Sequence, residues 1–516
     1  MSQAYDAIVI GAGHNGLTTA ALLGKAGRRV LVLERRAVVG GLAASEQFHP
    51  GYRSAGMLAD SGLVRERVID ALELSRHGLQ RRTVAPTVLA LGNGQDGGAP
   101  PLPILGDPEL AAQAIAERSP RDGQQYRALF AQVQRLAPAI AELFDRHPLD
   151  LIDLESESVW DLGRRALRVR KLGTKDLREL LRLPPMCVAD VLGERFETER
   201  LRAALSLPAL AGTFGGPWSP GTMLTLLRRE CLGGAGVVGG GPMLVAALRG
   251  AAEAAGVQVR TEAAVARVRL RGTTVEGVVL DDGERIDAPL VAASCSPRVT
   301  LGPLLPPGAL PHRLEHHIRN FRSRGIVAKV LLALDRPPAF GDEPVEYART
   351  AEHVDDIERA FDAVKYGELP DTPVLDIHVP TVADPSLAPP GHAVLAVTVG
   401  FVPHDLRGGW TDEARAGLGD TVVRLLARHD PELPDAVVGR QVLTPVDLEA
   451  RYGLPGGHLE HGEHGMDQLL IRPTPQCLHY ATPIDGLWLC GSGSHPGGGL
   501  SCAPGQLAAE AILRAR

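Results

Sequence analysis

The sequence predicts an α/β protein in which a Rossmann-type domain with a parallel sheet is joined to a second, discontinuous α+β domain. Two observations support this fold class. The first forty residues show the strand–glycine–helix–strand pattern of a βαβ unit, and a second strand–glycine–helix pattern lies near the C-terminus. Strand and helix patterns alternate between them over most of the 516 residues, without an internal repeat. We therefore expect the two ends of the chain to meet in one domain.

The N-terminal pattern has the length and order of one βαβ unit. Residues 5–10 and 29–34 are short apolar strands, and residues 17–25 carry apolar side chains at helical spacing. Between the first strand and the helix lies GAGHNG, residues 11–16, which matches the GxGxxG pattern. This context of strand, glycines, helix and strand predicts a dinucleotide site rather than a ligand-free turn.

Each glycine of this motif has a separate physical task. Gly11 permits the tight turn, Gly13 lets the backbone approach a pyrophosphate, and Gly16 lets the helix pack against the sheet. The N-terminus of the helix then offers free N–H groups and a partial positive charge to the phosphates. Glu34, at the end of the second strand, can accept hydrogen bonds from both hydroxyls of a ribose.

The same glycine pattern occurs a second time, at residues 234–239. The letters RRECL precede it, and these do not predict a strand. Without the strand, the pattern predicts no nucleotide site.

The residues after the second strand indicate which dinucleotide binds. Arg35 and Arg36 could pair with a 2′-phosphate, but the carboxylate of Glu34 would repel one. Gly40 and Gly41 follow directly, and paired glycines there allow backbone to run beside the pyrophosphate and ribityl chain of a longer cofactor. These residues predict FAD.

The rest of the chain divides into strand-rich and helix-rich stretches. We expect strands within 258–280, broken by a turn at Arg271-Gly272, and others at 290–295, 326–334 and 392–402. Residues 109–230 are mainly helical in period, and a helix is expected from Leu500 to Arg514. Proline-rich segments at 97–108, 305–311 and 380–391 are expected to be connections. The predicted FAD-binding domain comprises 1–90, 230–300 and 475–516, and the predicted substrate domain comprises 91–229 and 301–474.

Composition excludes several classes of function. The net charge of -7 and pI of about 6.2 do not favour nucleic-acid binding. The six cysteines form no CxxC pair and no metal-type spacing, which favours reduced thiols in a cytoplasmic protein without dithiol chemistry. No apolar stretch reaches the roughly 18 residues of a transmembrane helix. We expect a soluble protein that at most contacts a membrane peripherally.

A family resemblance becomes visible at both ends of the chain. AIVIGAGHNGLTTAALLGKAGRRVLVLERRAVVGG resembles the opening of glutathione-reductase-type flavoproteins, and GLWLCGSGSHPGGGLSCAPGQLAAEAIL resembles the flavin-covering segment of phytoene-desaturase-like enzymes. PWSPGTMLTLL, VVGRQVLTPVDLEARYGLPGGH and MDQLLIRPTP are similar to the pyridine nucleotide-disulfide oxidoreductase domain-containing protein 2 group. The motif and this resemblance together predict the following FAD-binding residues: Gly11, Gly13, His14, Asn15, Gly16, Glu34, Arg35, Gly40, Gly41, Leu42, Val265, Gly491, Ser492, Gly498, Gly499 and Leu500.

Two histidines are candidates for proton transfer, because small shifts bring the pKa of histidine across neutral pH. His495 lies inside the predicted flavin-covering segment. His461 lies in GHLEHGEH, residues 457–464, which the resemblance places in the substrate domain. Besides an active-site loop, this segment could be a zinc site, because it has three histidines in seven residues, or a plain solvated loop. The flanking glycines and the lack of a further nearby ligand favour no metal.

A basic run interleaved with leucines covers residues 164–182. It fits either a solvated helical face or a contact with an anionic membrane surface. Its cationic residues are Arg164, Arg165, Arg168, Arg170, Lys171, Lys175, Arg178 and Arg182.

These features together predict an FAD-dependent dehydrogenase or desaturase that takes hydride from a hydrophobic or amphipathic small molecule. No second nucleotide-binding unit is visible, which favours oxygen or a quinone over NAD(P)H as the redox partner. Amine oxidation, redox-neutral isomerisation and a non-catalytic, flavin-bearing scaffold are the alternatives.

Overall fold

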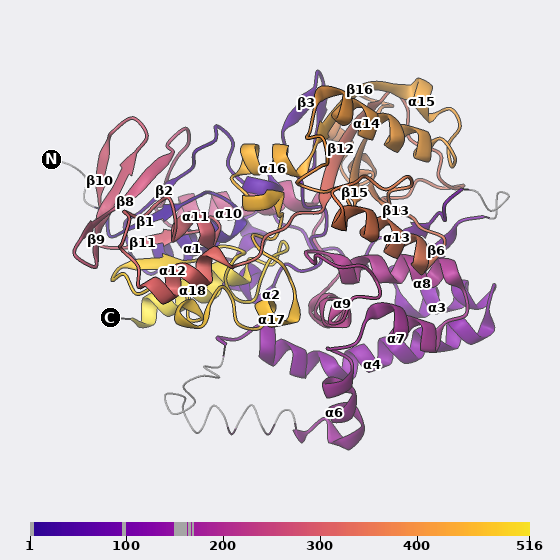
Figure 1. Cartoon of the computed structure of the whole chain (residues 1–516), viewed down its shortest axis with the longest axis horizontal. Helices are drawn as coiled ribbons and strands as arrows, with labels where there is room; N and C mark the ends of the chain where they lie inside the picture. Colours follow the sequence, from indigo (N-terminus) through magenta and orange to yellow (C-terminus); the bar gives the residue numbers. More distant parts are fainter. Residues whose placement is uncertain (1–4, 95–99, 149–162, 164–166, 168–169, 516) are drawn as a thin grey trace.

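The chain forms two lobes, each built around a β-sheet (Figure 1). The computed structural model describes residues 5–94, 100–148, 163, 167 and 170–515. Both chain ends belong to the same lobe, on the left of Figure 1, although hundreds of residues separate them. The α/β class is confirmed, with one sheet wholly parallel and a second sheet mixed.

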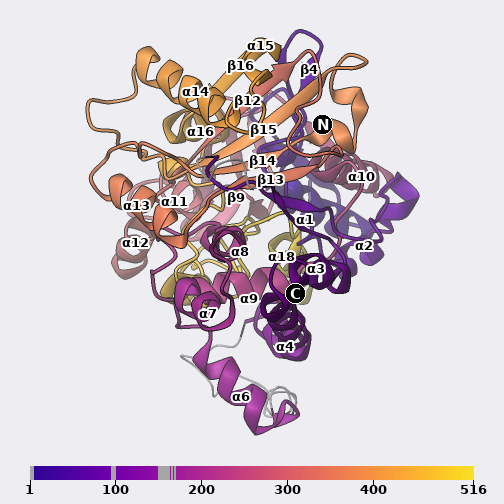
Figure 2. The ribbon, with the colours of Figure 1, turned by 90° about the vertical axis from the view of Figure 1, so that its right-hand side faces the viewer.

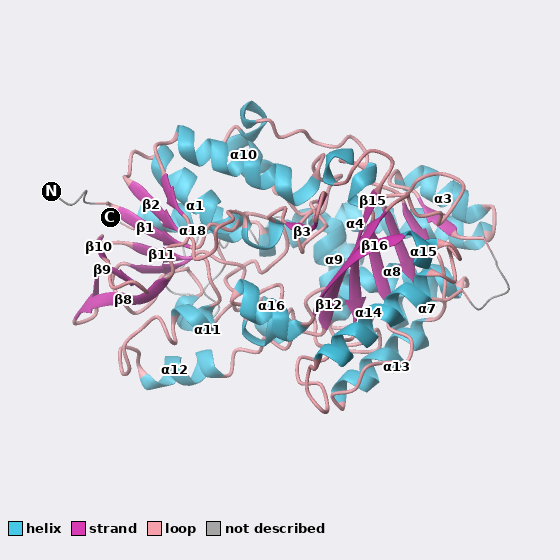
Figure 3. Ribbon diagram, turned by 90° about the horizontal axis from the view of Figure 1, so that it is seen from above, coloured by secondary structure: helices cyan, strands magenta, loops and turns pink. Residues whose placement is uncertain are grey.

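The first lobe contains a five-stranded parallel sheet in the order β17-β11-β1-β2-β7 (Figure 3). Its central strand pairs on both sides, with Ile8 opposite Leu31 on one side and Val291 on the other. Four of the strands are apolar throughout because helices and loops cover both faces, whereas the edge strand β7 carries Gln258 and Arg260. The strands are β1 (Ala7–Ile10), β2 (Val30–Leu33), β7 (Gln258–Arg260), β11 (Val291–Ala293) and β17 (Leu487–Leu489).

Helices from three distant parts of the sequence cover this sheet. The helix after the glycine motif packs against both of the others, so the C-terminal helix closes the lobe that the N-terminal helix opens. The C-terminal helix begins at Ala503, three residues later than predicted: Cys502 is left-handed, with φ of 58°, and Pro504 suits a first helical turn. The helices are α1 (His14–Lys25), α10 (Gly240–Ala254) and α18 (Ala503–Arg514).

A small antiparallel sheet extends the first lobe at the position predicted for residues 258–280. Its central strand pairs with both neighbours, and the predicted turn at Arg271-Gly272 joins the first two strands. The strands are β8 (Val265–Arg271), β9 (Thr274–Leu280) and β10 (Arg285–Asp287).

The second lobe contains a seven-stranded sheet in the order β16-β12-β15-β14-β13-β5-β6. The last strand lies inside a segment predicted as a connection. Its Pro103 is tolerated because β6 is an edge strand, where one side needs no N–H donor. The strands are β5 (Val88–Ala90), β6 (Leu102–Ile104), β12 (Val327–Leu334), β13 (Tyr347–Thr350), β14 (Leu375–His378), β15 (Ala393–Gly400) and β16 (Val437–Leu443).

The two faces of strand β12 have different neighbours. Val330 and Leu332 pack in one core with Val422 of helix α14 (Asp412–Leu426), whereas Leu331 packs with Leu42 from the first lobe. Because side chains alternate along a strand, the odd-numbered residues face the first lobe. This face of the sheet therefore borders the functional site.

The described residues between 109 and 230 are mainly helical, as predicted, and cover the lower side of the second sheet in Figure 1. Helix α6, which carries part of the basic run, projects from the body in Figure 2. Arg164, Arg165 and Arg168 lie outside the described residues. Within the described part of the chain, no helix is long and apolar enough to cross a membrane. The helices are α3 (Pro108–Ala116), α4 (Pro120–Phe144), α6 (Gly173–Arg182), α7 (Val188–Arg195), α8 (Glu199–Ser206), η4 (Leu207–Leu210) and α9 (Thr222–Leu232).

The packing of α1 against the sheet gives a first prediction. A Cβ atom on Gly16 would overlap the carbonyl oxygen of Gly11 and press on the Ser294 hydroxyl. Gly16→Ala should therefore lower the free energy of unfolding by about 1–3 kcal/mol, measured by urea denaturation. Gly417→Ala in α14 is the matched control, because its Cβ meets no atom within 4 Å. Equal stability of Gly16→Ala and the unsubstituted protein would contradict this packing.

Candidate functional site

A cavity of about 370 Å³ opens at the glycine motif, where strands β1 and β2 end. Residues from the glycine loop, the end of β2, the start of β8 and the loop after α16 (Pro445–Tyr452) meet around it. Ten of the predicted cofactor residues line it: Gly11, Gly13, His14, Asn15, Glu34, Arg35, Gly41, Leu42, Val265 and Ser492.

The backbone at Gly13 leaves room for a bulky group. Gly13 precedes α1 and caps it with no side-chain hydrogen bond, so the first N–H groups of the helix stay available. A Cβ atom on Gly13 would meet nothing within 4 Å, although its φ of −73° suits any residue. The protein therefore leaves a space open beside Gly13, at the N-terminus of α1.

Glu34 lies at the rim of the cavity and is 6% exposed. One of its carboxylate oxygens accepts a hydrogen bond from the Ala12 N–H at 2.9 Å, and the other accepts one from the Arg36 N–H at 3.0 Å. These bonds fix the carboxylate, and each oxygen keeps a lone pair for another donor. This arrangement suits recognition of a ribose.

The remaining predicted cofactor residues shape the walls without lining the cavity. Gly40, with φ of 121°, packs against Val245, and its N–H donates to the Ala12 carbonyl. The other glycines pack against backbone or side chains of neighbouring segments, and Leu500 is fully buried in the core around α1. The residues in this group are Gly16, Gly40, Gly491, Gly498, Gly499 and Leu500.

Three polar atoms at this cavity have no hydrogen-bond partner among the described residues. They are Nε2 of His14, Oδ1 of Asn15 and Nδ1 of His461, all buried. Buried polar atoms in proteins nearly always have a partner. Unpartnered atoms gathered at one cavity, together with the space beside Gly13, fit a polar cofactor bound there.

His461 forms part of the cavity wall and has a left-handed backbone, with φ of 57°. Burial, with a smaller contribution from the neighbouring His14, lowers the pKa of His461 to about 3. The ring is therefore neutral at physiological pH.

The other two histidines of this loop hold backbone in place. His458 Nδ1 accepts hydrogen bonds from the N–H groups of Glu460 and Gly462, at 3.2 and 3.3 Å. His464 lies 3.2 Å from both the Ala211 carbonyl oxygen and the Gly498 nitrogen. In the described part of the chain, no three His, Cys, Asp or Glu side chains are placed to hold a metal ion.

Arg472 ties this loop to the C-terminal segment. It is fully buried, and its guanidinium donates to the carbonyls of Glu460, Gly462, Glu463 and Ser492 at 2.7–3.1 Å. Burial lowers the pKa of Arg472 to about 9, which still leaves it charged at neutral pH.

His495 lies apart from the described cavities. Its ring stacks on Phe144 at 6.3 Å between centroids, and its Nε2 is 3.1 Å from the Arg146 carbonyl oxygen. Burial lowers the pKa of His495 to about 3.

A second cavity, of about 240 Å³, lies beside the cofactor cavity, on the other side of Leu58 and of the loop formed by residues 457–464. Leu58 lines both cavities, and His458 and Glu460 face the second one whereas His461 faces the first. Its surface is mainly apolar, with walls from 57–60, 207–213, 324–329 and the sheet. The loop thus separates two neighbouring cavities.

Lys329 is the buried cation of this second cavity. It lies on the face of β12 that borders the first lobe, and its Nζ donates to Thr398 Oγ1 at 2.5 Å. Burial lowers the pKa of Lys329 to about 8, partly offset by the charges of Asp376 and Glu460. Such a group exchanges a proton near neutral pH.

Lys329 and Glu460 were not among the residues predicted from sequence. A signal for Lys329 was present: it is the one charged residue in the apolar run IVAKVLLAL. Glu460 lies within GHLEHGEH, where the histidines are the stronger candidates for proton transfer by sequence alone. Its carboxylate accepts a hydrogen bond from the Gly499 N–H, and burial raises the pKa of Glu460.

The family described as flavin-containing amine oxidoreductase matches residues 16–505, which include the lysine cavity and the part of the cofactor cavity that follows the glycine motif. The chain belongs to this family. The flavin predicted from the glycine motif is thereby confirmed, and the cavity at Gly13 and Glu34 fits its dinucleotide form, FAD.

Relatives within and around this family match the chain over almost its whole length. The sequence is 34% identical over 550 residues to pyridine nucleotide-disulfide oxidoreductase domain-containing protein 2 of Rattus norvegicus, covering 99% of this chain and 93% of the relative. The predicted resemblance to this group is confirmed. A limonene dehydrogenase polypeptide of Castellaniella defragrans is 28% identical over 559 residues, covering 99% of this chain and 94% of the relative.

Solved structures share the fold of this flavin oxidoreductase. An oxidoreductase from Methanosarcina mazei superposes with a TM-score of 0.59 at 18% identity, covering 98% of this chain and 99% of that one. A putrescine oxidase triple mutant gives 0.60 at 16% identity and covers both chains fully. At these identities the likeness concerns the fold alone.

The open space at Gly13 gives a second prediction. Gly13→Ala should leave the urea stability of the apoprotein unchanged, because the new methyl group clashes with no protein atom. Its flavin affinity should fall at least tenfold, because the methyl group enters the space that we assign to the pyrophosphate. Titration of apoprotein with FAD, followed by flavin fluorescence, measures the affinity. Unchanged affinity would show that the cofactor does not pass Gly13.

Proposed function

We propose that this protein is an FAD-dependent dehydrogenase or desaturase that moves hydride from a hydrophobic or amphipathic small molecule to flavin N5. The observation that carries the proposal is the apolar cavity at Lys329, which shares Leu58 with the cofactor cavity. A substrate held there would be excluded from water and next to the cofactor site. We further propose oxygen or a quinone as the electron acceptor.

We propose that the predicted set of cofactor residues holds FAD, in the manner of glutathione-reductase-type domains. The parallel sheet, the motif context and the unpartnered atoms at the cavity support this assignment. We also keep the division into an FAD-binding domain and a substrate domain as a proposal. Strand β5 pairs in the seven-stranded sheet, so we place the first boundary before Val88 rather than after residue 90.

Bound FAD supplies a hydride acceptor, and the protein must bind the donor and move a proton. We assign proton exchange to Lys329 Nζ, since its pKa of about 8 lies near the operating pH. Thr398 positions the ammonium group through its hydroxyl. The apolar walls exclude water and orient the substrate.

The two predicted histidines receive different roles. His461 faces the cofactor cavity with a neutral ring, so we propose that it contacts the cofactor or the reacting end of the substrate. His495 packs on Phe144, and we propose that it only positions the C-terminal segment.

Amine oxidation is the second candidate. Of the carboxylates at the wall of the lysine cavity, Asp60 and Asp376 pair with Arg229 and Arg349, so the attraction for an ammonium group would come from Glu460. The same cavity would then bind the amine by its charged end.

Anaerobic mixing of the holoprotein with terpenoids, fatty-acid derivatives and aliphatic amines tests the function. We expect compounds of one lipophilic class to reduce the flavin, so that the absorbance of oxidised flavin disappears within a single turnover. Bleaching by amines alone would favour the second candidate. A flavin that no compound reduces, in a protein that dithionite does reduce, would favour a scaffold instead.

A third prediction concerns Lys329. Lys329→Met should slow substrate-driven flavin reduction by roughly 10²–10⁴-fold while FAD still binds, because the proton carrier is lost. In the unsubstituted protein the neutral amine accumulates as pH rises through about 8, so reduction should accelerate toward that pH and then level off. Stopped-flow absorbance measures both effects.

His461→Ala serves as the comparison for Lys329→Met. It should keep the pH dependence near 8, because Lys329 remains. A pH profile that is unchanged in Lys329→Met and lost in His461→Ala would assign proton transfer to the histidine.

A further inference from the structure

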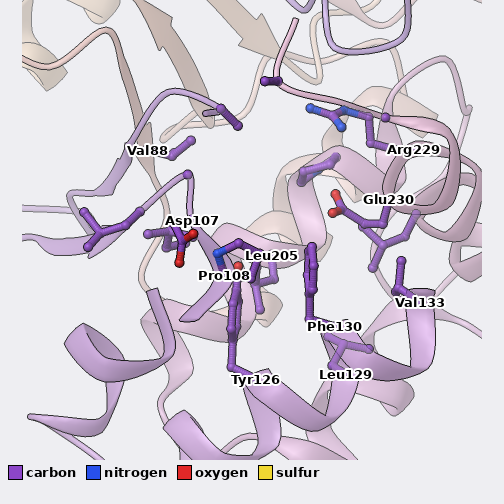
Figure 4. A pocket seen from close by; sticks show the side chains of 18 of the residues that line it. Val88, Asp107, Pro108, Tyr126, Leu129, Phe130, Val133, Leu205, Arg229 and Glu230 are labelled. Carbon is purple, nitrogen blue, oxygen red and sulfur yellow. The ribbon is translucent and has the colours of Figure 1, made fainter. Parts of the chain in front are cut away.

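A third cavity, of about 400 Å³, lies away from the cofactor, among helices α4 and α9 and strands β5 and β6 (Figure 4). Its lining is mainly apolar, with Leu129, Val133 and Leu227 among the side chains. The exposed residues Val84 and Gln134 stand at its edge, so it opens to solvent. A ligand can therefore reach it from outside the protein.

A single carboxylate without a partner points into this cavity. Figure 4 shows Glu230 reaching in from α9, opposite the rings of Tyr126 and Phe130 on α4. Within the described ranges, no group donates a hydrogen bond or forms an ion pair with Glu230. The other carboxylate in the lining, Asp107, is already used: it caps α3 by accepting from the N–H groups of Glu109 and Leu110 at 2.9 Å.

The two guanidinium groups at this cavity are held by carboxylates of the lysine cavity. Arg229 donates to Asp60 at 2.5 Å, and Arg349 donates to Asp376 at 3.2 Å. Both acceptors line the lysine cavity, so these ion pairs span the wall between the two cavities. Each arginine thus donates to a carboxylate of its own, and Glu230 adds a further negative charge whose effect on Arg229 is weaker than that of Asp60.

The surroundings of Glu230 define the ligand chemistry. A carboxylate beside aromatic faces attracts a cation, and the aliphatic lining favours an apolar chain. Burial, with a further contribution from Glu230, raises the pKa of Tyr126 to about 12, so its hydroxyl keeps its proton. We propose that this cavity is a binding site for aliphatic ammonium ions, with the charged head at Glu230 and the chain between α4 and α9.

Titration calorimetry of the FAD-loaded protein with n-octylammonium, 1-octanol and octanoate tests the proposal. We expect n-octylammonium to bind at least tenfold more tightly than the alcohol, and octanoate to bind least. Glu230→Gln should weaken n-octylammonium binding by about 10- to 100-fold and leave 1-octanol nearly unaffected, as expected for losing a charged acceptor. Phe130→Leu should weaken the amine severalfold through the lost aromatic face.

Two control variants locate the bound amine. Glu117→Gln removes an exposed carboxylate at the end of α3, outside the cavity, and should change nothing. Lys329→Met tests whether the amine binds in the lysine cavity instead. Amine binding that survives Glu230→Gln but changes in Lys329→Met would overturn the proposal, as would equal affinity for octanoate. Calorimetry measures binding and not turnover, so the outcome of this test does not depend on the proposed function.

Discussion

The site depends on one buried cation, the guanidinium group of Arg472. It binds the carbonyl groups of Glu460, Gly462, Glu463 and Ser492, so the loop of residues 457–464 is fixed against the C-terminal segment of the first lobe. Burying such a group is costly unless each N–H finds an acceptor, and here several carbonyls supply them. The loop position, and with it the wall between the two cavities, follows from this contact.

The two sides of this loop face different cavities. His461 faces the cofactor cavity, whereas Glu460 faces the lysine cavity. Side chains alternate along β12, so Lys329 points toward the first lobe while its neighbours in the strand pack in the core under α14. Lys329, to which we assign proton exchange, thus lies in an apolar space next to the cofactor site without lining that site.

The cofactor half of the site could be predicted from sequence because its signal is local. The glycine motif, Glu34 and Gly41 lie within about thirty residues of one another, and each requirement is a property of the backbone there. The lysine cavity could not be predicted in this way, since its walls come from segments hundreds of residues apart. Pro103 shows the same limit for the fold: only the sheet order reveals that its strand is an edge.

We propose that the cofactor and the substrate occupy neighbouring cavities, separated by the loop that Arg472 fixes. A crystal structure of the FAD-bound protein tests it most directly. We expect density for the adenosine portion beside Glu34, for the pyrophosphate beside Gly13, and for the flavin ring at the Leu58 end of the cavity, toward Lys329. A flavin ring directed away from Leu58, with the lysine cavity filled by side chains, would contradict it.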